Sequence, residues 1–459
     1  MSGYFWVPEK PDVRVWGAFA ADGGHKPEAI LAGGLVNDPR VVTNSAGGRA
    51  FLSSAAATIK AFQPITLRGQ LDTGPAVTLV DARNHGRDGF YFGSPHYKAD
   101  YAVIGDRHVS GVDQLFGAVR FRFGDPYWLG HLREGRASAV GGDGSALTVE
   151  TSDDGNWLVY TAAAPATLRE LKTTVVSGCL ALAELAVDQD FVARDTHVRI
   201  NEGDPWLSVH GPDSDKPPNE FDARTLLPRE ELTVERFARW IPFNEALDGL
   251  ACVVARPIQA PLQTQILVVT HLVEGLHRRM PETFEQSRFA GASPSALKRI
   301  KEAALRAARG MAMNRRALDA RQVDVAMMSA VSHFEDVDYL QRATDVVTKV
   351  CAVLPEIAES VADLPICLTD ARNDMAHQFP LDHENEPLGV RHLRWSVVAS
   401  VMPWLLRGLL LLEAGIDPSV LHDRHVAYSR FLDFRATVSQ FAGELGCELP
   451  SSGRAPVEG

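Results

Sequence analysis

The sequence predicts an α+β protein with a β-rich N-terminal part and an all-α C-terminal part. The first observation is the uneven distribution of glycine, since 27 of the 37 glycines lie at or before Gly249. The second is a series of short alternating or β-branched runs, separated by Gly/Asp turns, which is typical of β-sandwiches and barrels. The third is that the remaining chain repeats apolar residues every three or four positions, the period of an amphipathic helix.

The strand signal is clearest in residues 117–124. Three apolar residues alternate there with Arg120 and Arg122, so one face of the strand is apolar and the other is basic. Further strands are expected within residues 12–20, 64–72, 76–82 and 156–162. We therefore predict a sandwich or barrel-like domain over residues 1–255, with a helix near 230–247 that leads out of it.

The second half is predicted to be a helical bundle over residues 256–443, followed by a flexible tail over residues 444–459. Its first helix spans residues 261–280, where the apolar residues fall on one face. Asp363 is a suitable N-cap for a later helix, with Pro365 in the first turn. The other expected helices are 295–309, 316–333, 336–354, 390–414 (stopped by Gly415) and 418–443.

Composition places the chain among ordinary soluble proteins, with 45% hydrophobic and 23% charged residues. The net charge of −12 argues against a chain coated with nucleic acid, although a local basic groove can still attract RNA. Five widely spaced cysteines and an N-terminus without a secretion signal predict a reduced, cytoplasmic protein. The most apolar segment, 396–415, is interrupted by Pro403 and Arg407, so we predict a buried core or interface helix and no membrane contact.

One polar cluster lies near the end of a predicted helix, in DARNDMAHQFP at 370–380. Arg372 falls among apolar residues on one face, and Asn373 and His377, four residues apart, share a neighbouring face. Arginine stabilises charge on phosphoryl oxygens, imidazole moves a proton and an amide orients either group, so the three suit a phosphate. The alternative is the polar end of an ordinary helix, because an Arg–His pair at this spacing arises by chance roughly once in such a chain.

The motif also resembles that of a known protein family. RNDMAH at 372–377 resembles the R-x4–6-H motif of HEPN domains, and the arrangement around it is similar to that of ApeA-like proteins. The resemblance extends to a helix at 264–280 before the motif and a long apolar helix at 393–415 after it. ApeA-like proteins carry a β-rich N-terminal domain, and WGAFAADGG followed by AILAGGLVND resembles its opening strands.

The resemblance implies a metal-independent endoribonuclease of bacterial antiviral, abortive-infection defence that uses no cofactor. Arg372, Asn373 and His377 would be its catalytic residues, in a site formed between two paired HEPN domains. A homodimer or higher homo-oligomer is therefore expected, with helix 390–414 as the candidate contact. The substrate would be RNA, for example tRNA, and we expect the N-terminal domain to sense a phage-derived protein. The alternative is a catalytically silent dimerisation or nucleotide-binding module whose β domain binds a ligand or protein.

A basic stretch of 24 residues, beginning at Lys298, precedes the motif. We predict that Lys298, Arg299, Arg315 and Arg316 contact RNA phosphates. The alternative is a solvated helix face. The His and Glu side chains of segment 383–386 fit no established metal-ligand spacing, so no metal site is expected. The basic residues of the stretch are Lys298, Arg299, Lys301, Arg306, Arg309, Arg315, Arg316 and Arg321.

Overall fold

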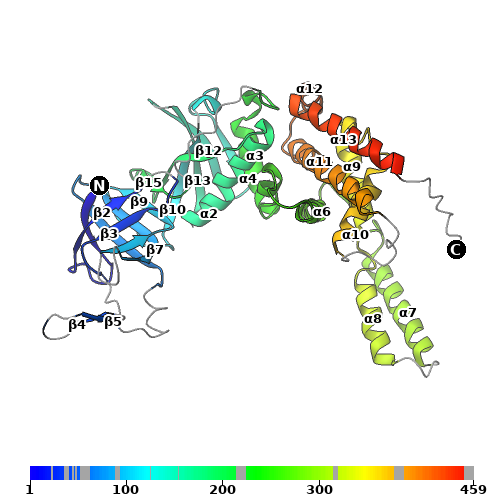
Figure 1. Cartoon of the computed structure of the whole chain (residues 1–459), viewed down its shortest axis with the longest axis horizontal. Helices are drawn as coiled ribbons and strands as arrows, with labels where there is room; N and C mark the ends of the chain where they lie inside the picture. Colours follow the sequence, from blue (N-terminus) through cyan, green and yellow to red (C-terminus); the bar gives the residue numbers. More distant parts are fainter. Residues whose placement is uncertain are drawn as a thin grey trace. The chain divides into compact units, whose positions relative to one another are not determined.

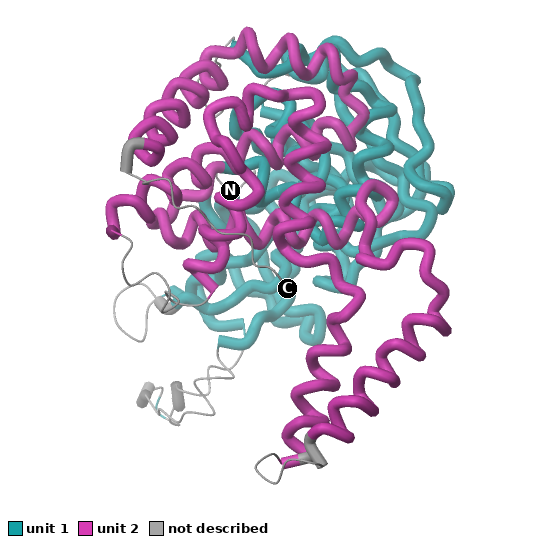
Figure 2. Tube along the Cα trace, turned by 90° about the vertical axis from the view of Figure 1, so that its right-hand side faces the viewer, with its two compact units in different colours: residues 1–256 teal, residues 257–459 magenta. Residues whose placement is uncertain are grey.

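The structure is a computed structural model of the chain. It forms two compact units, Met1–Arg256 (unit 1) and Pro257–Gly459 (unit 2), which Figure 2 shows in teal and magenta. The division falls one residue from the boundary expected from the sequence. The described residues are 1–21, 24–35, 41–43, 46, 49–51, 62–87, 94–124, 126–153, 155–212, 224–313, 319–376 and 387–448.

Unit 1 begins with a closed antiparallel β-barrel of strand order β7-β6-β1-β2-β3-β8, in which β8 pairs back with β7 (Figure 1). Closure is possible because β7 pairs with β6 through its first half and with β8 through its second. Phe5, Leu67 and Leu79 are fully buried in the barrel core. The strands are β1 (Ser2–Trp6), β2 (Val15–Ala20), β3 (Glu28–Leu31), β6 (Ile65–Leu71), β7 (Ala76–Arg87) and β8 (Pro95–Lys98), with a separate pair β4 (Val41–Thr43) and β5 (Arg49–Phe51).

The same 13-stranded antiparallel sheet continues from β7 in the order β9-β15-β14-β10-β13-β12-β11, and we call this part the second sheet. In β10 the rings of Phe121 and Phe123 are buried, while Arg120 and Arg122 are only partly buried, as the alternation predicts. The strands are β9 (Tyr101–Gly105), β10 (Leu115–Phe123), β11 (Ala137–Val140), β12 (Ser145–Ser152), β13 (Gly155–Thr167), β14 (Ala193–Arg199) and β15 (Leu207–His210).

Helices cover the apolar face of this second sheet, and the sequence prediction missed most of them. α3 (Ser177–Val187) is almost wholly buried and is apolar apart from Ser177 and the buried Glu184, so it shows no amphipathic period. α4 (Val234–Ala246) packs on α3, β11 and β12, whereas we expected it to lead out of the domain. The remaining helical segments are α2 (Leu168–Glu170), the π-helical turn η3 (Leu171–Val176), η2 (Pro126–Trp128), η4 (Arg229–Glu231) and α5 (Leu250–Ala255).

Unit 2 is helical, so the predicted order of a β-rich part followed by an all-α part is confirmed (Figure 1). The predicted last helix, 418–443, is instead two helices because Tyr428 adopts an extended backbone between them, and the second reaches Glu448, inside the predicted tail. The elements are α6 (Leu262–Arg279), α7 (Pro294–Met313), α8 (Ala320–Ser332), α9 (Tyr339–Cys351), η5 (Pro355–Ile357), α10 (Leu364–Ala376), α11 (Leu388–Glu413), α12 (Pro418–Ala427) and α13 (Ser429–Glu448).

α11 is the core helix of unit 2 and packs on α6, α9, α10 and α13. Its leucines Leu405, Leu409 and Leu411 are fully buried within unit 2, and a dimer contact through this helix stays a prediction. Among the described helices it alone is long and apolar enough to cross a membrane, but 67% of its most apolar window is buried inside the protein. The apolar composition of α11 is therefore accounted for by packing.

Candidate functional site

The helix α10 carries Arg372 and Asn373 of the polar motif, and its start is fixed by the predicted cap. The Asp363 carboxylate accepts a hydrogen bond from the backbone N–H of Ile366 at 3.2 Å, which satisfies one of the free donors of the first turn. Pro365 occupies the first turn, where no backbone donor is needed. The cap determines which residues of α10 turn toward the bundle.

The buried face of α10 ends in a carboxylate. Leu364, Leu368, Ala371 and Asp374 recur at helical spacing, and each is at most 1% exposed. The sequence prediction placed Arg372 on the apolar face, but Arg372 lies beside it and is half-buried. Asp374 was overlooked because its charge, taken alone, indicates an exposed position.

Asp374 joins the end of α10 to the beginning of α11. Its Oδ2 atom accepts hydrogen bonds from Nε1 of Trp395 at 3.0 Å and from Nη1 of Arg394 at 3.4 Å. All three side chains are buried, so the contact is shielded from solvent. This cluster holds the turn of α10 that carries Arg372 against the core helix.

Arg372 has no carboxylate partner among the described residues of the chain. Its Nη1 donates to Oδ1 of Asn373 at 3.4 Å, and its Cζ atom lies 5.5 Å from the centre of the Tyr339 ring. An amide and an aromatic ring orient a guanidinium without neutralising its charge. The Arg372 guanidinium is therefore able to bind an anion that the protein itself does not supply.

Tyr339 is the residue of this site that sequence reasoning missed. It opens α9, which packs on α10, and its hydroxyl is buried without a hydrogen-bond partner among the described residues. Burial raises the pKa of Tyr339 well above its ordinary value, and the positive charge of Arg372 lowers it by a smaller amount. The phenol therefore stays protonated. No local pattern in the sequence links it to Arg372, since the two meet only through helix packing.

The predicted partner His377 lies outside the described residues, because the described part of α10 ends at Ala376. The structure thus brings Arg372, Asn373 and Tyr339 together, and the role of His377 stays a prediction. The segment 383–386 also lies outside the described residues. Within the described ranges, no group of three or more His, Cys, Asp or Glu side chains is arranged to hold a metal ion.

The predicted basic stretch is partly neutralised. Lys298 and Arg299 are exposed on α7, and no ion pair forms on either within the part of the chain that the structure describes, whereas Arg315 and Arg316 lie outside that part. Other members of the stretch form ion pairs with acidic side chains, two of which lie outside the stretch. These pairs are Lys301–Glu335 at 2.6 Å, Arg309–Asp324 at 2.6 Å and Arg306–Glu302 at 3.9 Å.

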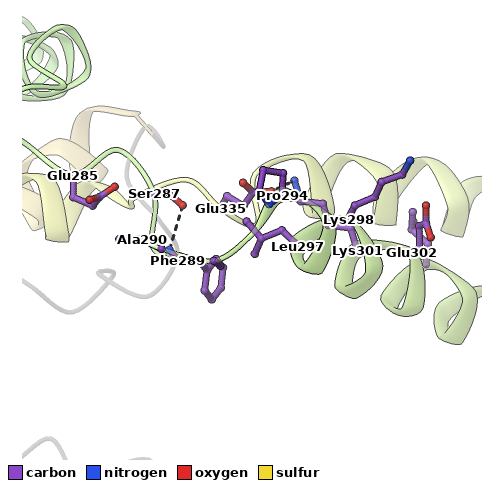
Figure 3. Close-up of a pocket in the computed structure, with 13 residues that line it drawn as sticks. Glu285, Ser287, Phe289, Ala290, Pro294, Leu297, Lys298, Lys301, Glu302 and Glu335 are labelled. Atoms are coloured by element: carbon purple, nitrogen blue, oxygen red, sulfur yellow. Dashed lines mark hydrogen bonds and ion pairs between the residues drawn. The ribbon is translucent and has the colours of Figure 1, made fainter.

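A hollow of about 620 Å³ lies at the start of α7 and includes Lys298 in its lining (Figure 3). Three glutamates and two lysines surround it, and Lys301 is paired with Glu335. Figure 3 shows Lys298 extending away from the ring of Phe289, so the two do not converge on one point. Mixed charge of this kind does not form a basic groove, and Arg372 is not part of the lining.

Unit 1 contains another group of arginines, on the face of the second sheet opposite Phe121. Arg120 donates from Nε to Nδ1 of His197 at 3.2 Å, and its Nη1 lies 3.5 Å from the Glu150 carboxylate. Its Cζ atom also lies 4.5 Å from the Trp157 ring centre and 4.7 Å from that of Trp206. Burial, and then the charge of Arg120, lowers the pKa of His197 to about 4, so the imidazole is neutral and accepts.

Comparison with known proteins identifies the N-terminal part of the chain. Residues 1–140 match a family model described as ApeA N-terminal domain 1. The matched stretch begins before β1 and ends with β11, so it contains the whole barrel. No curated protein and no solved structure matches the chain. The helical unit lies outside the family match, so the likeness to ApeA proteins is shown for residues 1–140.

Proposed function

We propose that this protein is a metal-independent endoribonuclease of bacterial antiviral defence. The observation that carries the proposal is the state of Arg372, a half-buried guanidinium held by an amide and a ring, with no carboxylate partner among the described residues. A phosphodiester supplies the missing negative charge. The ApeA-like N-terminal domain supports the defence context, because ApeA-like proteins act against phages.

The chemistry needs no metal because the nucleophile belongs to the substrate. The RNA 2′-hydroxyl gives up its proton and attacks the adjacent phosphorus, and the 5′-oxygen leaves with a proton. Arg372 stabilises charge on the phosphoryl oxygens, Asn373 orients the guanidinium or the phosphate, and His377 moves a proton. The products carry a 2′,3′-cyclic phosphate and a 5′-hydroxyl.

The proposed working form is a homodimer or higher homo-oligomer in the cytoplasm. Two copies of the motif on α10 would face one RNA backbone, as the HEPN resemblance implies. The exposed Lys298 and Arg299 of α7 add phosphate contacts whose strength falls as salt rises. Arg315 and Arg316 are proposed to contribute in the same way.

Cleavage by purified protein in EDTA tests the mechanism, with total RNA and tRNA as substrates. Wild-type protein should cut, and His377→Ala should abolish cutting while the thermal unfolding curve stays the same. A strict requirement for a divalent ion would show that the metal-independent mechanism is wrong.

Unit 1 is proposed to restrain the site until it binds a phage-derived protein. Such control requires that the trigger bind the active arrangement better than the resting one. RNA cleavage by residues 256–459 and by the full chain, each with and without phage lysate, checks this role. The full chain should respond to lysate and the fragment should not. An equal response of both would remove the sensing role from unit 1.

A catalytically silent dimerisation or nucleotide-binding module is the second candidate. The observation in its favour is the neutralisation of Lys301, Arg306 and Arg309 by acids, which weakens the expected RNA-binding surface. The growth of cells that express the wild-type protein or Arg372→Ala distinguishes the two candidates. An active nuclease should arrest growth and Arg372→Ala should relieve the arrest, whereas equal growth of both strains favours the silent module.

A further inference from the structure

Tyr339 is the aromatic side chain that faces Arg372. It is the first residue of α9, and the N-cap Asp338 fixes this helix start by accepting the backbone N–H of Gln341 at 2.8 Å. Because α9 packs directly on α10, the ring lies 5.5 Å from the guanidinium carbon of Arg372. Two successive α-helices thus bring a phenol and an unneutralised cation together.

No described residue of unit 2 accounts for the hydroxyl of Tyr339. It is buried and has no hydrogen-bond partner among the residues that the structure describes. Buried tyrosine hydroxyls usually find a partner, and an unpaired one destabilises the folded state. Phenylalanine would fill the same space without the unpaired oxygen. A partner that binds from outside the chain accounts for the hydroxyl.

The hydroxyl can act only as a hydrogen-bond donor to an anion. Burial raises the pKa of Tyr339 above its ordinary value, so the phenol is neutral near pH 7 and carries a proton to donate. A neutral O–H donates a hydrogen bond to a phosphate oxygen and adds no charge of its own. This chemistry complements the charge of Arg372.

We propose that Tyr339 is a further phosphate-binding residue of the site, whose hydroxyl donates to a phosphodiester oxygen of RNA held by Arg372. The inference rests on the proposed function and extends the motif of α10 to a second helix. In the free protein the ring holds the guanidinium. When RNA binds, the guanidinium swings toward the phosphate and the hydroxyl gains the partner that it lacks.

Binding of an oligoribonucleotide with 2′-O-methyl groups throughout tests this proposal in the full chain, because this RNA keeps its phosphates but cannot be cut. Tyr339→Phe should raise Kd about three- to tenfold, as expected for one lost neutral hydrogen bond, and should leave Tm unchanged or higher. Tyr428→Phe is the matched control, since Tyr428 is a buried tyrosine of unit 2 whose ring packs on Trp404. Its Kd should equal that of the wild type.

The outcomes distinguish this inference from the proposed function. If Tyr339→Phe binds the RNA with the wild-type Kd while Arg372→Ala binds it more weakly, the role of the hydroxyl is wrong and the phosphate site of Arg372 stands. A lower Tm for Tyr339→Phe would also overturn it, because the hydroxyl would then be a structural group. If Arg372→Ala binds as tightly as the wild type, or if the wild type does not bind, the phosphate site itself is wrong.

Discussion

Arg120 in unit 1 and Arg372 in unit 2 are both partly buried arginines beside aromatic rings, but their partners differ. Arg120 is held by an imidazole, a carboxylate and two tryptophan rings. Arg372 is held by one amide and one tyrosine ring. The fold itself satisfies Arg120, so that arginine stabilises the sheet, whereas Arg372 keeps a charge that a ligand can use. The partners of the two arginines, and not their burial, therefore distinguish Arg120 from Arg372, the residue proposed to bind phosphate.

The largest expected effect is the loss of cleavage on removing the unsatisfied arginine. Arg372→Ala should lower RNA cleavage by a factor on the order of 10²–10³, because the charge that develops on the phosphate loses its stabiliser. The free energy of unfolding should change by less than about 1 kcal/mol, since no buried partner is left unpaired. Cleavage assays and urea denaturation measure the two quantities. Arg372→Lys keeps the charge but not the planar geometry, so it should recover only part of the activity.

Asp374 sharpens the comparison because it belongs to the same turn but is paired within the fold, where its Oδ2 atom accepts from Arg394 and Trp395. Asp374→Ala leaves the buried Arg394 without its carboxylate and should lower the free energy of unfolding by about 3 kcal/mol. Asp374→Asn keeps an acceptor for Trp395 and should cost less. Urea denaturation gives both values. A stability loss for Asp374→Ala no larger than that for Arg372→Ala would contradict the division into structural and binding groups.

Low pH should lower the free energy of unfolding of both units, because each unit buries a neutral imidazole. Burial is the main cause that lowers the pKa of His197 in unit 1 and of His425 in unit 2 to about 4, from an ordinary value of 6.5. As pH falls below 6.5, these histidines become protonated in the unfolded chain but stay neutral in the folded chain. The free energy of unfolding therefore declines between pH 6.5 and about pH 4. Above pH 6.5 it does not depend on these two groups.

His425 is fully buried, so its share of this acid loss is up to about 3 kcal/mol. Its Nδ1 hydrogen-bonds to the backbone oxygen of Leu421 at 2.8 Å, which fixes the neutral tautomer. With His425→Gln, the free energy of unfolding of unit 2 should change less between pH 6.5 and 4 than it does in the wild type. Urea denaturation at a series of pH values measures this. An unchanged slope would show that another group titrates.

The smallest effect is expected for the satisfied arginine. Arg120→Ala should lower the free energy of unfolding of unit 1 by about 1–2 kcal/mol, because its cation–π and hydrogen-bond contacts are lost while Glu150 can still face solvent. Urea denaturation measures this loss. If Arg120→Ala leaves stability unchanged, the contacts around it contribute nothing and the comparison with Arg372 fails.

Local patterns were sufficient for much of the fold. The alternation in 117–124 predicted which face of β10 is buried, and Asp363 and Gly415 fixed a helix start and a helix end correctly. α3 was missed because a wholly buried helix has no polar face to reveal its period. The break at Tyr428 carries no proline or glycine, so no local signal divides α12 from α13.

The site was predictable only where its residues lie on one helix. Arg372 and Asn373 were singled out by their residue types and their spacing to His377, and the structure shows the two in contact. Tyr339 and Trp395 reach the same turn from other helices, and their positions depend on how α9 and α11 pack, which a single sequence does not encode locally. The acids Asp324 and Glu335, which neutralise part of the basic stretch, were overlooked for the same reason.

The most direct test of the central claim is the chemistry of the RNA ends produced by the full chain in EDTA. Wild-type protein, activated by phage lysate where necessary, should leave 2′,3′-cyclic phosphate and 5′-hydroxyl ends on tRNA. Arg372→Ala should leave intact tRNA under the same conditions, while Arg120→Ala should cut with the same end chemistry as the wild type. Cleavage that persists in Arg372→Ala, or ends that carry a 5′-phosphate, would contradict the assignment of the phosphate site to Arg372.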